Sequence, residues 1–387
     1  MEMLSIEEPL EVGPETLKHK IDSGEEFVLL DVRTPWEYDA WSINYAGVEP
    51  LLLPVQDLFS QPEAALERIP LNKEVLIVCA HGNRSLFATQ ILTSLGYRAK
   101  SVRGGMNLLN ALCDTAEINI DSELVILQIR RIVKGCVGYI LASRETGEAV
   151  IVDPQHLAHT SCLEETKRLG LRVVAVVETH RPLDHISGGH RLSETLKAPL
   201  YTFSPAQPAP DTRIIRLGSY TLEPAALNQN LNSAILVVSK RSSKAPVAVF
   251  TGDLLFTDGY ARPDALGAAN VEEQAKALYQ VYDWLFENIP AEAVVLPSHC
   301  APQNIRKGTP IQATLGEIKS RLWSPKPRPD ELLDFLLKHL PPKPANHELI
   351  AQINTHPQKY LAIADERQLR DIESGQNNMT IRKHKSP

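Results

Sequence analysis

Between residues 15 and 110, short apolar runs alternate with segments of helical periodicity. The runs at 27–32, 75–78 and 99–102 have the length of buried strands. The segment 85–95 has helical spacing and stops at Gly96, a residue type that favours the end of a helix. Strands that alternate with helices predict a parallel sheet of the α/β class.

The same alternation restarts near residue 123. Helical segments are predicted at 160–169, 272–289 and 330–339. Further runs of strand length lie at 124–133, 138–142, 149–153, 173–177, 234–238, 247–250 and 293–296. We therefore expect two domains, at 1–115 and 116–355, followed by a C-terminal tail at 356–387 whose last dozen residues are frayed.

The charge and the hydropathy pattern exclude several classes of partner. A net charge of -7 gives no reason to expect nucleic acid or an anionic membrane. No stretch approaches the ~18 apolar residues of a membrane span. Residues 1–26 are acidic and polar, unlike a secretory signal peptide. We expect a soluble chain in the cytoplasm.

The five cysteines are scattered and include no C-x-x-C pair. A disulfide framework or a thiolate zinc site is therefore not expected. Cys113, Cys136 and Cys162 are interpreted as small buried side chains, because most free cysteines pack in this way. Cys79 has neighbours that indicate chemistry, and Cys300 directly follows a histidine.

The run 75–78 leads directly into a loop with the sequence Cys79-Ala80-His81-Gly82-Asn83-Arg84-Ser85. A loop between a strand and a helix can direct several N–H groups and the helix dipole toward one sulfur atom. Gly82 permits a tight turn, Arg84 supplies a forked cation, and Ser85 can cap the helix. The pattern predicts a stabilised thiolate or persulfide at Cys79, assisted by Arg84, with His81 tuning access.

This part of the chain resembles the rhodanese family over roughly residues 15–112. The resemblance is carried by Asp31-Val32-Arg33 with Glu37, by C-x-x-G-x-R-S at 79–85, and by Arg103-Gly104-Gly105-Met106. It implies a rhodanese-like parallel-sheet domain. It also implies that Cys79 takes a sulfane sulfur from a small-molecule donor, holds it as a persulfide and passes it to a thiol acceptor.

Histidine and aspartate residues follow three of the later runs. The motif Thr179-His180-Arg181-Pro182-Leu183-Asp184-His185 follows the run 173–177. Asp253 follows 247–250, and His299 follows 293–296. Because neighbouring strand ends converge at one sheet edge, these side chains are expected to form a metal-binding edge.

Residues of about 123–355 resemble the metallo-β-lactamase superfamily, closest to its glyoxalase II and persulfide dioxygenase branch. The resemblance is carried by Gly138-Tyr139-Ile140-Leu141, the 179–185 motif, Thr251-Gly252-Asp253 and Asn354. It implies an αββα fold. For this sequence, the first expectation is a metal-depleted domain, and one zinc or iron ion is the alternative.

The resemblance implies that the first metal position is incomplete. That position would use His180 with the residues aligned to two further histidines, and Asp253. Here these residues are Pro182, whose side chain has no donor atom, and Gln229, which offers only a neutral oxygen. An iron centre that needs two imidazoles and a carboxylate would lack one imidazole.

The second metal position keeps all its implied ligands, which are Asp184, His185, His299 and Asp253. Three interpretations of this domain remain open. In the first, the domain has lost catalysis and binds a persulfide or a partner. In the second, it hydrolyses a thioester or a similar bond with one metal ion that activates water. In the third, it binds iron weakly through Gln229.

For the whole chain, the first prediction is a sulfurtransferase of persulfide or thiosulfate metabolism with a metal-depleted lactamase-fold module. The alternatives are a metal-dependent hydrolase of the glyoxalase II kind, a persulfide dioxygenase, and a non-catalytic persulfide sensor. A homo-oligomer is left open.

Overall fold

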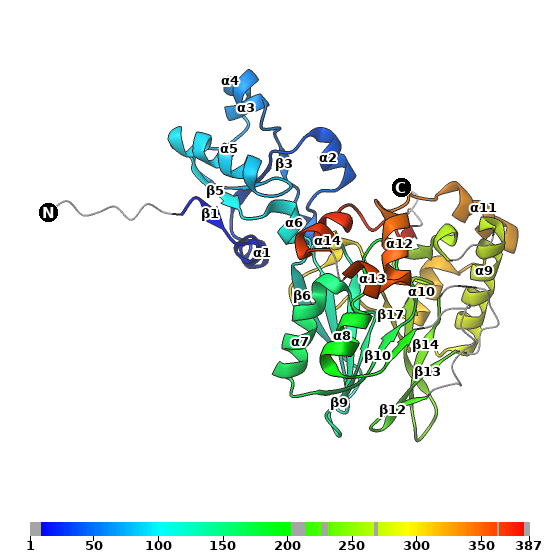
Figure 1. The fold of residues 1–387 in the computed structure, drawn as a ribbon. Coiled ribbons are helices and arrows are strands. Elements are labelled where there is room, and N and C mark those ends of the chain that lie inside the picture. The colour runs from blue at the N-terminus through cyan, green and yellow to red at the C-terminus, as the bar shows by residue number, and fades with distance from the viewer. Residues whose placement is uncertain are drawn as a thin grey trace. The chain divides into compact units, whose positions relative to one another are not determined.

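The computed structural model describes residues 9–202, 214–225, 231, 233–266, 270–361 and 364–382 (Figure 1). The chain forms two compact units. The first holds Met1–Leu112 together with Pro302–Arg306, and the second holds Cys113–Ala301 and Lys307–Pro387. The grouping of residues 302–306 with the first unit was not predicted from the sequence.

The first unit is built on a parallel sheet of five strands in the order β1-β5-β4-β2-β3. Each neighbouring pair in it is parallel, which confirms the predicted sheet class. The strands are β1 (Glu11–Val12), β2 (Phe27–Asp31), β3 (Leu51–Leu52), β4 (Glu74–Val78) and β5 (Arg98–Val102).

The helices of the first unit are α1 (Pro14–Ser23), α2 (Pro35–Ala40), α3 (Asp57–Ser60), α4 (Pro62–Leu66), α5 (Asn83–Ser94) and α6 (Gly105–Leu109). Ala88 and Leu92 of α5 pack in one apolar cluster with Val75 and Ile77 of β4. Burial of this helix face against the sheet is what fixes α5. The loop from β4 into α5 therefore emerges from a rigid strand and enters a rigid helix.

The second unit contains two six-stranded sheets, in the orders β11-β10-β9-β8-β7-β6 and β12-β13-β14-β15-β17-β18. The first comprises β6 (Cys113–Asn119), β7 (Leu124–Arg131), β8 (Val137–Ser143), β9 (Glu148–Val152), β10 (Arg172–Glu178) and β11 (Leu200–Thr202). The second comprises β12 (Ile215–Leu217), β13 (Tyr220–Pro224), β14 (Leu236–Lys240), β15 (Pro246–Gly252), β17 (Val294–Pro297) and β18 (Ala313–Thr314).

Helices cover the outer faces of the two sheets (Figure 1). Side chains of α7 (His159–Arg168) and α8 (Gly189–Leu196) share an apolar cluster with β7 to β10. A second cluster joins β14, β15 and β17 to α9 (Val271–Asn288), α10 (Leu315–Leu322) and α11 (Pro329–Lys338). Tyr139 of β8 lies edge-on to Phe250 of β15, with ring centroids 5.2 Å apart, so the inner faces meet. This arrangement confirms the predicted αββα fold.

The C-terminal segment, expected to be a tail at 356–387, is instead part of the second unit. It forms α13 (Pro357–Leu361), α14 (Glu366–Ile372) and β19 (Thr380–Arg382), after α12 (His347–Thr355). β19 pairs with β16 (Gly259–Ala261) in an antiparallel ribbon. The expected fraying is wrong for residues 379–382, because Met379 and Ile381 are apolar side chains that become buried.

Within the described ranges, none of the helices combines the length and the apolar character that a membrane crossing needs.

Candidate functional site

The sulfur atom of Cys79 lies at the start of α5, directly after β4. The backbone N–H of Gly82 donates to this sulfur at 3.1 Å, and the hydroxyl oxygen of Ser85 lies 3.4 Å from it. Gly82 is the residue that precedes the first turn of this 12-residue helix. The sulfur therefore occupies the positive end of the helix dipole, where a negative charge is stabilised.

Two glycines give the Cys79 loop its shape. Gly82 has φ 97°, a left-handed conformation that other residues rarely adopt. At Gly105, a Cβ atom would lie only 2.1 Å from the carbonyl oxygen of Cys79. The next backbone nitrogen, that of Met106, donates to the same carbonyl at 2.8 Å. The loop is thus held against the start of α6 by backbone contact that a larger residue at Gly105 would prevent.

Ser85 contacts the sulfur and does not cap the helix. α5 already begins at Asn83, and no side chain caps its N-terminus, so the predicted role of Ser85 as a cap was wrong. The Ser85 hydroxyl donates to the carbonyl of Gly82 at 3.0 Å and shares a hydrogen bond of 2.8 Å with the hydroxyl of Ser101. These contacts hold the Ser85 oxygen beside Cys79.

Arg84 is engaged by a carboxylate of α2. Its two terminal nitrogens donate to the two oxygens of Glu37, at 2.8 and 2.6 Å. The hydrogen bonds from Arg84 hold the pKa of Glu37 at about 2, although partial burial opposes this shift. The forked donors of Arg84, which were expected to stabilise the sulfur, instead bind Glu37 and tie α5 to α2. The Arg84 charge still interacts electrostatically with Cys79.

The other loop residues line the surface around Cys79. His81 and Asn83 are exposed, whereas Cys79 itself is only 1% exposed. The carbonyl of Ala80 accepts from the backbone nitrogen of Asn107 at 3.0 Å. The Cys79 sulfur therefore lies at the base of an ordered loop with polar residues on its outer side.

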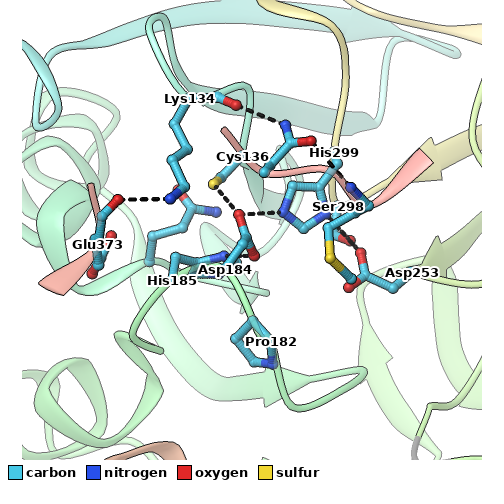
Figure 2. Close-up of polar contacts among 12 residues, drawn as sticks. Lys134, Cys136, Pro182, Asp184, His185, Asp253, Ser298, His299 and Glu373 are labelled. Atoms are coloured by element: carbon cyan, nitrogen blue, oxygen red, sulfur yellow. Dashed lines mark hydrogen bonds and ion pairs between the residues drawn. The ribbon is translucent and has the colours of Figure 1, made fainter. Parts of the chain in front are cut away.

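In the second unit, the loops after β10, β15 and β17 bring the predicted His and Asp residues together (Figure 2). Both ring nitrogens of His299 are used, Nδ1 at 2.7 Å from Asp253 Oδ1 and Nε2 at 3.1 Å from Asp184 Oδ2. His185 Nδ1 lies 2.8 Å from Asp184 Oδ1. Asp184 is thus the shared partner of two imidazoles, and Asp253 supports His299 from the other side.

Cys136 joins this cluster, contrary to its interpretation as a packing thiol. Its sulfur lies 3.2 Å from Asp184 Oδ2. One donor atom from each of Cys136, Asp184, His185 and His299 lies within 4.8 Å of all the others, and all four residues are buried. No sequence signal placed Cys136 in this cluster, because it is far from the other three residues along the chain and belongs to no spaced motif.

The buried carboxylate of Asp184 is stabilised by positive charge on its neighbours. Burial would raise the pKa of Asp184, but His299 and His185 hold it well below its ordinary value. Burial alone would lower the pKa of His185. Asp184 and Cys136 outweigh this effect and raise that pKa to about 10. The carboxylate therefore requires a cation beside it, which is supplied either by protons on the imidazoles or by a metal ion.

The first metal position holds few donors. His180 Nε2 is buried, has no hydrogen-bond partner among the described residues, and lies 3.3 Å from Asp253 Oδ2. Pro182 contributes no side-chain donor, and its carbonyl accepts from Asn354 at 2.9 Å. Gln229 lies outside the described residues. The described part of the chain thus offers one imidazole and one carboxylate, which do not fit an iron centre of two imidazoles and one carboxylate.

Asn354 of α12 fixes the loop that carries the second-position ligands. Its side-chain nitrogen donates to the carbonyls of Pro182 and His185, each at 2.9 Å. Its side-chain oxygen accepts from the backbone nitrogen of Ser187 at 2.8 Å. This one amide therefore holds both ends of the segment that presents Asp184.

Known proteins are similar to each unit. Residues 13–111 match the family profile of the Rhodanese-like domain. The chain is 32% identical over 168 residues to human mitochondrial persulfide dioxygenase ETHE1, covering 42% of this chain and 62% of that protein. It is 28% identical over 171 residues to hydroxyacylglutathione hydrolase of Nitrosococcus oceani, covering 42% of this chain and 60% of that protein. The chain thus spans less than two thirds of the length of these relatives.

A solved structure supports the fold of the second unit. A metallo-beta-lactamase from Staphylococcus aureus has a TM-score of 0.52 and 21% sequence identity, covering 60% of this chain and 72% of that chain. At this identity, the likeness concerns the fold alone.

The ion pair between Glu37 and Arg84 predicts a pH-dependent contribution to stability. Because folding lowers the pKa of Glu37 from 4.5 to about 2, the contribution is present above pH 4.5 and is lost as the pH falls toward 2. In urea unfolding, the wild type should therefore exceed Glu37→Gln in free energy of unfolding at about pH 6, and the difference should shrink by about pH 3. A difference that is the same at both pH values would contradict the assigned pair.

Proposed function

Because the chain joins a rhodanese-like domain to a unit with the metallo-β-lactamase fold, we propose that it is a sulfurtransferase in which Cys79 carries sulfane sulfur. The single observation that carries this proposal is the Gly82 N–H at 3.1 Å from the Cys79 sulfur, at the N-terminus of α5. A donor in this position stabilises an anionic sulfur without supplying a proton to it.

The proposed reaction has two transfer steps. The Cys79 thiolate attacks the outer sulfur of a donor such as thiosulfate, the sulfur–sulfur bond of the donor breaks, and sulfite leaves with its electron pair. Cys79 then carries a persulfide anion. An acceptor thiolate attacks the terminal sulfur of this persulfide, which regenerates the Cys79 thiolate and releases the acceptor as a persulfide.

The loop supports both charged states. The Gly82 N–H and the dipole of α5 stabilise the thiolate, and the same potential acts on a persulfide that is one bond longer. The Ser85 hydroxyl, 3.4 Å from the sulfur, would stabilise the anion as a second donor when its proton turns from the Gly82 carbonyl to the sulfur. Arg84 adds positive charge near the sulfur while Glu37 holds its orientation.

The donor and the acceptor are proposed to be small molecules. The sulfur is nearly fully buried, which favours a compact donor such as thiosulfate or a low-molecular-weight persulfide. The name of the human relative, a persulfide dioxygenase, favours persulfides as the class that this chain handles. A thiol is the acceptor that would yield such a persulfide.

The second unit is not proposed to oxidise persulfides. In the described residues, the first position offers the His180 imidazole and the Asp253 carboxylate, and Pro182 adds no side-chain donor. The third ligand of the implied iron triad falls on Gln229, which offers only an amide oxygen. Without a second imidazole, iron would be held weakly.

The role of Cys79 predicts the effect of its removal. Cys79→Ser should reduce sulfur transfer from thiosulfate or glutathione persulfide to a thiol to the rate without protein, because a hydroxyl cannot form the persulfide. Cys162→Ala removes another buried thiol, in α7, and should keep the wild-type rate. Wild-type transfer by Cys79→Ser would overturn the proposal.

Because the first metal position lacks ligands, we expect the chain to oxidise persulfides slowly or not at all. The purified wild-type chain supplied with iron and glutathione persulfide should consume little oxygen, measured with an oxygen electrode. Gln229→His adds an imidazole at the position where the resemblance implies a ligand and should raise the amount of bound iron. Robust oxygen uptake by the wild type, with about one iron per chain, would show that the assigned ligand set is incomplete.

A further inference from the structure

The thiol of Cys136 has no part in the proposed sulfur transfer, yet it lies among metal-ligating side chains. We propose that Cys136 completes a closed, four-ligand zinc site, so that the metal supports the fold of the second unit and does not activate water. The other three ligands are Asp184, His185 and His299. This inference does not depend on the role of Cys79.

The donor set and its spacing suit zinc. A tetrahedral zinc ion with one sulfur, two nitrogen and one oxygen ligands keeps them about 3.3–3.8 Å apart, given bonds of about 2.0–2.3 Å. The Asp184 oxygen lies 3.2 Å from the Cys136 sulfur and 3.1 Å from His299 Nε2. No pair in the group exceeds 4.8 Å, so small side-chain adjustments would place all four around one ion.

Charge balance favours the same ion. One thiolate, one carboxylate and two neutral imidazoles carry two negative charges, which a divalent zinc ion cancels. All four residues are at most 2% exposed, and a neutral complex avoids the cost of burying net charge. The nearby cations Lys134 and Arg131 bind Glu373, through its backbone carbonyl at 2.6 Å and its carboxylate. Arg131 Nη1 also lies 4.0 Å from the Cys136 sulfur, where its charge favours the thiolate.

The backbone holds two of the ligands together before any ion binds. Cys136 and His299 face each other in an isolated antiparallel bridge. The nitrogen of Val137 donates to Ser298 at 2.7 Å, and that of Cys300 donates to Gly135 at 2.9 Å. The thiol is therefore delivered to the cluster by strand-like pairing that the fold maintains on its own.

Asp253 orients a ligand from outside the group. It lies 2.7 Å from His299 Nδ1, which directs the opposite nitrogen, Nε2, toward Asp184 (Figure 2). Carboxylate support of this kind is common behind metal-bound histidines and raises their basicity. With Cys136 as the fourth ligand, zinc has no open position for water, which distinguishes a structural from a hydrolytic site.

X-ray absorption at the zinc edge tests the inference directly. The full chain carrying Cys79→Ser, which removes the reactive thiol, is loaded with zinc and freed of unbound metal. We expect about one zinc per chain, with one sulfur scatterer at about 2.3 Å and the remaining ligands at about 2.0–2.2 Å. Zinc with no sulfur ligand, or no stoichiometric zinc, would overturn the proposal.

Replacing zinc with cobalt in the Cys79→Ser chain allows Cys136→Ala to be compared with a matched control variant. Cys136→Ala should lose the thiolate-to-cobalt charge-transfer band, whereas Cys162→Ala should keep it. Added azide should leave the cobalt spectrum unchanged, because the site is closed. A band that survives in Cys136→Ala, or a spectrum that azide shifts, would contradict the closed site. Since the absorption measurement needs no change at Cys136, poor folding of Cys136→Ala leaves the inference testable.

Discussion

The contact between the Gly82 N–H and the Cys79 sulfur is the interaction on which the proposed chemistry of the first unit depends. It exists because a parallel strand ends where a helix begins, and because Gly82 adopts a left-handed turn between them. The close approach of Gly105 to the Cys79 carbonyl fixes that turn from the other side. A sulfur anion is thereby stabilised by backbone dipoles, which remain in place whether the sulfur is a thiolate or a persulfide.

The second unit handles buried negative charge in a different way. Asp184 accepts from two imidazoles and lies beside the Cys136 thiol, so its carboxylate needs a cation within the cluster. Dipoles from helix and loop backbones meet this need in the first unit, whereas the second relies on ionisable side chains that also suit a metal. The first arrangement suits the proposed sulfur transfer, and the second suits the proposed zinc ion.

Local sequence patterns were enough to predict much of the fold. The apolar runs before Cys79, His180 and Asp253 became the strands β4, β10 and β15, because each pattern reflects burial within a few residues. The Cys79 loop was predicted for the same reason, since its glycine, cysteine and helix start are adjacent in the chain.

What sequence reasoning missed depends on contacts between distant segments. Cys136 reaches the cluster through its bridge to His299, a pairing that no local pattern encodes. Arg84 binds Glu37, 47 residues away, so its forked donors are directed to a carboxylate that the local pattern around Cys79 does not include. The pairing of β19 with β16 likewise joins segments more than a hundred residues apart and turned an expected tail into part of the sheet structure.

The central claim is that Cys79 holds transferable sulfur, and a single-turnover measurement tests it most directly. The wild-type chain is treated with thiosulfate, freed of donor, and analysed by intact and peptide mass spectrometry before and after addition of a thiol. The account predicts one added sulfur atom per chain, located on the peptide containing Cys79, and its complete transfer to the thiol. Added sulfur on a peptide containing Cys136 or another cysteine, or none at all, would contradict it.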